Sequence, residues 1–105
     1  MTEHISIKLG CQFKRFTPQL ADFIYAVCRA WDLYIPSVTP VITSANDGQH
    51  MDGSKHYLDK AWDLRIRNLE AGMIEEIARM LRVDLGKDWD IVVEKDHLHV
   101  EYDPY

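Results

Sequence analysis

The sequence has few of the residues that mark fibrous, disordered or disulfide-rich proteins. Its 105 residues include two cysteines, five glycines and four prolines. This composition excludes a collagen-like or low-complexity chain and leaves no disulfide framework. Cys11 and Cys28 are also too far apart for a Cys-rich zinc site, so we expect free structural thiols. The hydrophobic share of 47% is that of a globular protein.

Positive charge and long apolar runs are scarce as well. The formal net charge is −5, with 12 basic against 17 acidic residues, which argues against binding nucleic acid, because that needs a concentrated basic face. No apolar run approaches the roughly 20 residues that span a bilayer. Residues 1–5 have neither the basic start nor the apolar core of a signal peptide. We therefore expect a monomer made in the cytoplasm, with no nucleic-acid partner and no membrane span.

Two segments have the periodicity of amphipathic helices. Thr17, a capping residue followed by proline, opens an apolar stripe with spacings of three and four, which predicts a helix over residues 17–34. A second stripe predicts a helix over residues 68–82, with Gly86 as the stop signal.

Four other segments have the alternation or the β-forming residues of strands. They are residues 41–43, 61–66, 89–94 and 97–102. Only Lys95 and Asp96 separate the last two, which predicts a β-hairpin at the end of the chain. With the helices, these strands predict a single α+β domain over residues 1–105, in which two main helices pack on an antiparallel sheet.

Histidines occupy two places that such a sheet can bring together. His56 lies near the end of a polar stretch of about fifteen residues, 44–60, and Asp63 lies on the strand that follows. A loop of that length is uncommon in a compact domain unless it is functional. His97 and His99 are two residues apart on a strand, so their imidazoles project from one face. If the strands pair, two histidines and an aspartate can converge. Three such ligands with an open fourth position suit catalytic zinc.

The hairpin supplies candidates for a general base. With a two-residue turn, Glu94 faces His97 directly across the strands. A carboxylate there could take a proton from metal-bound water. Asp96, three residues before His99, competes for this role, and we expect it to reach the site only if the turn or a bulge redirects it. Hairpin geometry therefore favours Glu94.

These residues resemble a known family. Residues 54–63 read Ser-Lys-His-Tyr-Leu-Asp-Lys-Ala-Trp-Asp. This is similar to the Ser-x-His-x-x-Gly-x-Ala-x-Asp signature of the zinc D-alanyl-D-alanine carboxypeptidases, the phage L-alanyl-D-glutamate endolysins and the hedgehog signalling domain. The His-Leu-His of residues 97–99 resembles their second motif, His-x-His. The resemblance covers roughly residues 40–103 and departs from the family at Asp59, where a glycine is usual.

The resemblance implies a hedgehog/DD-peptidase-like fold that binds one Zn²⁺. Its ligands would be His56, Asp63 and His99, with His97 beside the scissile carbonyl. The family's general base is a Glu, Asp or His a few residues ahead of the last ligand, which fits either hairpin carboxylate.

The implied activity is hydrolysis of peptidoglycan stem peptides by metal-activated water, at D-Ala-D-Ala or at L-Ala-D-Glu. The chain would then act on the cell wall after release or export. The alternative is a non-catalytic, zinc-stabilised binding or structural domain, as the hedgehog branch illustrates. A binding domain can lose its proton-transfer group and keep its zinc. The presence of both Glu94 and Asp96 therefore favours the enzyme.

Overall fold

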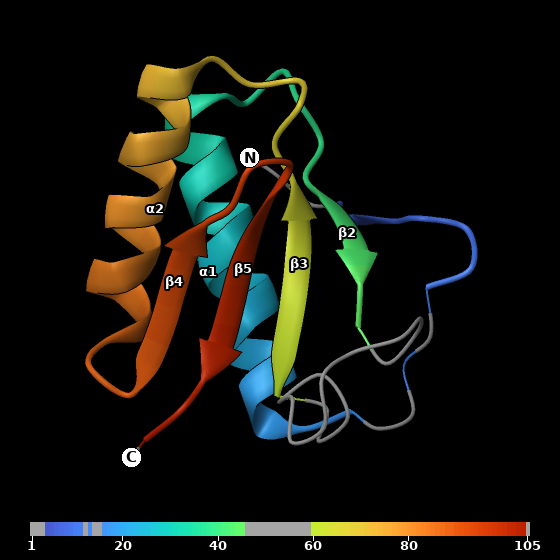
Figure 1. Ribbon diagram of the computed structural model, residues 1–105, viewed down its shortest axis with the longest axis vertical. Coiled ribbons are helices and arrows are strands. Elements are labelled where there is room, and N and C mark those ends of the chain that lie inside the picture. The colour runs from blue at the N-terminus through green and yellow to red at the C-terminus, as the bar shows by residue number, and fades with distance from the viewer. Residues whose placement is uncertain (1–3, 12, 14–15, 46–59, 105) are drawn as a thin grey trace.

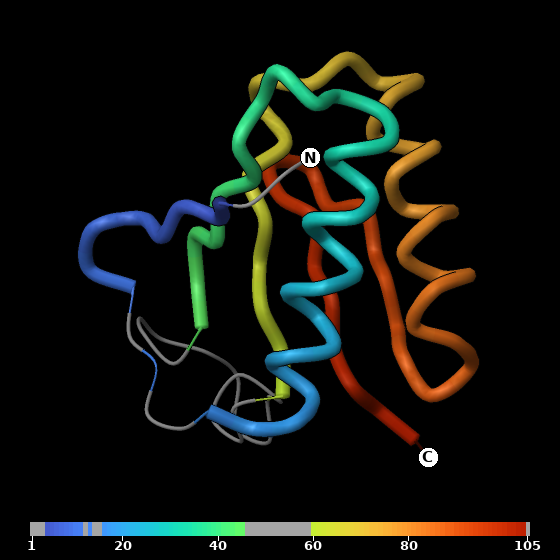
Figure 2. Tube along the Cα trace, turned by 180° about the vertical axis from the view of Figure 1, so that it is seen from behind, coloured from blue at the N-terminus to red at the C-terminus, as the bar shows by residue number. Residues whose placement is uncertain are grey.

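The structure is a computed structural model that describes residues 4–11, 13, 16–45 and 60–104. In these residues, a five-stranded sheet carries two helices on one face, which confirms the α+β class (Figure 1). Figure 2 shows the same helices from behind, with the sheet beyond them. The elements in chain order are β1 (Ser6–Ile7), α1 (Pro18–Tyr34), β2 (Val41–Ser44), β3 (Ala61–Arg65), α2 (Ala71–Leu85), β4 (Trp89–Val93) and β5 (His97–Tyr102).

Helix α1 begins where the sequence predicts. The Thr17 hydroxyl accepts a hydrogen bond from the Leu20 backbone N–H at 3.1 Å, and proline occupies the first helical position. The apolar stripe packs into the core through Leu20, Phe23, Ala26, Val27, Ala30 and Trp31. Cys11 and Cys28 form no disulfide bond in the part of the chain that the structure describes.

Helix α2 begins and ends three residues later than predicted. Its N-cap, Glu70, makes no side-chain capping bond, and the Leu69 N–H donates to the Ile66 carbonyl in a preceding turn. The start therefore carries no strong capping signal. At the other end, the Arg82 guanidinium donates to the Ile91 carbonyl of β4, and the helix continues to Gly86, whose φ of 92° ends it. Neither helix is long and apolar enough to be a candidate membrane span, among the residues described.

The sheet has the strand order β1-β2-β3-β5-β4 and is mixed, so the antiparallel prediction is wrong at one edge. Strand β1 pairs with β2 in parallel, whereas every other pair is antiparallel. Parallel pairing needs a crossover connection, and α1 is that connection. Because Ser6 and Ile7 are both exposed, β1 has no alternation that a sequence could reveal.

The terminal hairpin matches the prediction and sets the register of the central strands. The Glu94 N–H donates to the His97 carbonyl at 2.9 Å and closes the two-residue turn. Strand β5 then pairs with β3, with Asp63 opposite His99. The side chains of these two strands that pack under the helices are Trp62, Leu64, Leu98 and Val100, all at most 1% exposed. Alternation leaves the polar residues of both strands on the face without helices.

Candidate metal centre

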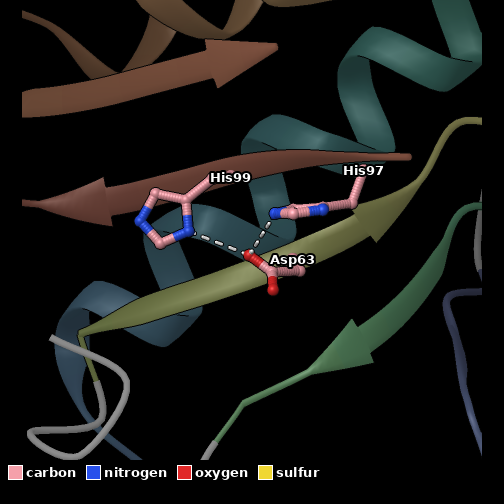
Figure 3. Close-up of side chains that lie close together, drawn as sticks. All are labelled: Asp63, His97 and His99. Atoms are coloured by element: carbon pink, nitrogen blue, oxygen red, sulfur yellow. Dashed lines mark hydrogen bonds and ion pairs between the residues drawn. The ribbon is translucent and has the colours of Figure 1, made fainter. Parts of the chain in front are cut away.

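Strands β3 and β5 bring three predicted site residues together on the helix-free face of the sheet. Asp63 comes from β3, and His97 and His99 come from β5. Each offers one ligand atom within 4.8 Å of the others, and all three side chains are half-buried (Figure 3). The strand pairing places Asp63 opposite His99, and a period of two places His97 on the same face.

Both imidazoles turn one nitrogen toward the same carboxylate oxygen. His99 Nδ1 lies 2.9 Å from Asp63 Oδ1, and His97 Nε2 lies 3.7 Å from that oxygen (Figure 3). The two ring centroids are 6.5 Å apart and their planes are inclined at 79°. The arrangement therefore presents two imidazole nitrogens and a carboxylate around one point.

The other nitrogen of each imidazole meets a second carboxylate. His97 Nδ1 lies 2.7 Å from Asp96 Oδ1, and His99 Nε2 lies 2.8 Å from Glu101 Oε1. Sequence reasoning missed Glu101. The available signal was its spacing, because a residue two positions after His99 on a strand shares its face.

These contacts set the charge of the cluster. The hydrogen bond to Asp63 is the main cause that raises the pKa of His99 from 6.5 to about 9, against the opposing effect of burial, and Glu101 adds to the rise. His99 is therefore cationic at neutral pH without metal, and it donates to both carboxylates. A metal ion that binds its nitrogen must displace a proton.

A pocket of about 360 Å³ opens beside the cluster. Its lining residues are Lys8, Thr43, Asp63, Arg65, Arg67, Asp96 and His97. Asp63 and His97 therefore belong both to the cluster and to the pocket. Three basic side chains and two carboxylates line the pocket, so the basic groups outnumber the acidic ones, which suits an anionic group.

The structure places the two candidate bases differently. Glu94 is exposed and lies opposite His97 through its backbone, as predicted, but it does not line this pocket. Asp96 lines the pocket and contacts His97. The expectation that a two-residue turn would keep Asp96 away from the imidazoles is wrong, because the last turn residue adjoins the first imidazole and its short side chain reaches that ring. The roles of both carboxylates stay predictions.

The remaining predicted ligand, His56, lies outside the described residues, as does Asp59. The two predicted ligands among the described residues, Asp63 and His99, supply a carboxylate and an imidazole, both of which zinc accepts in catalytic sites. The chemistry of these residues therefore fits the ion that the sequence predicts. No protein-family model matches this chain, and no curated protein matches it either.

Proposed function

We propose that the chain is a zinc-dependent metallopeptidase that hydrolyses peptidoglycan stem peptides, as a D-Ala-D-Ala carboxypeptidase or an L-Ala-D-Glu endopeptidase. One observation carries the proposal. Asp63 and His99 belong to two different motifs and are 36 residues apart in the sequence, yet Asp63 Oδ1 and His99 Nδ1 lie 2.9 Å from each other. The motifs resemble those of zinc peptidases of this class, and their ordered spacing is what predicted the meeting.

Asp63 and His99 would hold the zinc, and His56 would be the third ligand that the resemblance implies. When bound, zinc would supply Lewis acidity, which lowers the pKa of a bound water toward about 7 and polarises a peptide carbonyl. His97 stands beside the ligands with Nε2 directed at Asp63 and Nδ1 at Asp96. A donor in that position can stabilise negative charge that develops on the carbonyl oxygen of the substrate.

The general base would be a carboxylate of the hairpin. A side-chain contact favours Asp96, because this residue lines the pocket and its Oδ1 lies 2.7 Å from His97 Nδ1. The strand register favours Glu94, because its backbone is paired with that of His97 across the turn. Either one would take a proton from the attacking water and deliver it to the leaving amine.

The pocket charge supports a substrate with free carboxylates. Lys8, Arg65 and Arg67 line it next to Asp63 and His97. A stem peptide carries a carboxylate at its C-terminus and on its D-Glu residue. Guanidinium groups recognise such groups through paired N–H donors.

The second candidate is a zinc-stabilised binding domain without activity. One observation favours it: the hydrogen bond that joins Asp96 to His97 lowers the pKa of the Asp96 carboxyl. A lowered pKa makes the carboxylate a weaker proton acceptor. The same residues would then retain zinc and bind peptides without cutting them.

Peptide hydrolysis by the purified, zinc-loaded chain tests the proposal. Peptides that end in D-Ala-D-Ala or contain L-Ala-D-Glu are expected to be cut, and a chelator is expected to stop the reaction. The base is the residue whose variant, Asp96→Asn or Glu94→Gln, lowers kcat/KM by about 10²–10⁴-fold while zinc is retained. Glu75→Gln is the matched control, because Glu75 is an exposed carboxylate on α2, on the other side of the sheet from the cluster. Stoichiometric zinc without cleavage of either peptide would support the binding domain instead.

A further inference from the structure

Glu101 makes a contact with the cluster that the proposed reaction does not use. Its Oε1 lies 2.8 Å from His99 Nε2, while the opposite nitrogen of that ring, Nδ1, faces Asp63. The imidazole is thus held between two carboxylates from two strands. The side chains of His99 and Glu101 are 20% and 22% exposed, so their contact is partly shielded from water.

The carboxylates around Glu101 favour a hydrogen-bond donor next to its side chain. Glu101, Asp90 and Asp103 each have a carboxylate oxygen within 4.8 Å of the others. Neighbouring like charges repel, and an N–H of His99 gives the Glu101 carboxylate a compensating partner. Asp90 lies directly across from Glu101 in the β4–β5 pairing, where its side chain is exposed.

We propose that Glu101 is a positioning residue that keeps the proton on His99 Nε2 and directs Nδ1 to the metal ion, an inference that rests on the proposed zinc site. A neutral imidazole binds a metal through one nitrogen and carries its proton on the other. Since Asp63 lies on the Nδ1 side, the metal shared with Asp63 binds there, and Glu101 accepts the hydrogen bond from Nε2–H. Without Glu101, the ring loses the partner that fixes its tautomer and orientation.

Zinc affinity of the full chain, measured by competition with a chromophoric chelator, is the first test. Glu101→Ala is expected to weaken zinc binding about 10–100-fold. Glu101→Gln keeps the side-chain size and an acceptor oxygen, so we expect it to recover part of that loss. Glu75→Gln removes a negative charge from helix α2, where Glu75 is exposed and away from His99, and is expected to stay within about threefold of the parent. Circular dichroism of each metal-free variant separates a lost contact from a lost fold.

The second readout is the ¹⁵N spectrum of the zinc-loaded imidazoles, which a purely structural role of Glu101 would not alter. In the parent chain, His99 is expected to keep its proton on Nε2 and bind zinc through Nδ1. Coordination through Nε2 would overturn the proposal. So would equal zinc affinities of Glu101→Ala and Glu75→Gln.

These outcomes separate this inference from the proposed activity. If the parent binds zinc in a Glu101-dependent manner but cuts no stem peptide, the peptidase proposal fails and the role of Glu101 stands. If the parent cuts stem peptides and Glu101→Ala binds zinc as tightly as the parent, the role of Glu101 fails alone. A parent chain that binds no zinc overturns both.

Discussion

The two faces of β3 and β5 differ in chemistry although they belong to the same strands. The helix-covered face consists of Trp62, Leu64, Leu98 and Val100, each at most 1% exposed. On the other face, the side chains of Asp63, His99 and His97 are 13%, 20% and 31% exposed. Because side chains alternate along a strand, a slip of one residue would exchange the faces and bury the imidazoles. The apolar face therefore fixes the register on which the candidate metal centre depends.

The sharpest test of this comparison truncates two adjacent side chains of β5 that lie on opposite faces of the sheet. Leu98 is fully buried, so Leu98→Ala is expected to lower the free energy of unfolding by about 2–5 kcal/mol. His97→Ala, one residue away on the other face, is expected to cost less than about 1 kcal/mol, because its ring is partly exposed. Urea unfolding of the metal-free variants measures both. Equal losses would show that the two faces contribute alike to stability.

We expect zinc binding to make the polar face contribute to the stability of the folded chain. A ligand at 100 times its Kd that binds only the folded chain stabilises it by about 2.7 kcal/mol. We therefore expect zinc to raise the Tm by several degrees and a chelator to remove the increase. Asp63→Ala should abolish the effect, whereas Glu75→Gln should preserve it. A zinc-induced rise that survives Asp63→Ala would place the metal elsewhere.

Local signals in the sequence predict much of this scaffold. The helix start at Thr17 and the two-residue turn before His97 depend on neighbouring residues, and both are found as predicted. Strand β1 was missed because its two residues pair with a strand beyond α1 and have no buried side. Strand β1 can therefore be identified only from the tertiary structure.

The candidate site, too, was predicted only in part from local signals. Alternation along a strand is local, so it predicted the shared face of His97 and His99. The contacts of Asp96 and Glu101 depend on the rotation of each imidazole, which the strand period does not determine. The pattern thus predicted which groups meet, while the hydrogen-bond partners required side-chain coordinates.

The pH dependence of the metal-free chain tests the charge of the polar face. The pKa of His99 is about 9 in the folded chain, raised first by Asp63, against an ordinary value of 6.5 in the unfolded chain. The stabilisation is therefore complete below pH 6.5 and is lost as pH rises through 9. We expect the Tm to fall across this window and to fall less in His99→Gln, which does not titrate there. Equal slopes for both chains would contradict the role of His99.

The smallest expected effect concerns an apolar side chain that pairs with the cluster across the sheet. Val92 lies across from His99 on the polar face and is 43% exposed. Val92→Thr keeps the β-branched shape and adds a hydroxyl that water can reach, so we expect a change in unfolding free energy within about 0.5 kcal/mol. On the helix-covered face, Val100→Thr would bury that hydroxyl at a position with 0% exposure, and we expect a loss of about 1–3 kcal/mol. Urea unfolding of the pair measures the difference between the faces with the same chemical change. A loss above about 1.5 kcal/mol in Val92→Thr would mean that the polar face is packed like the core.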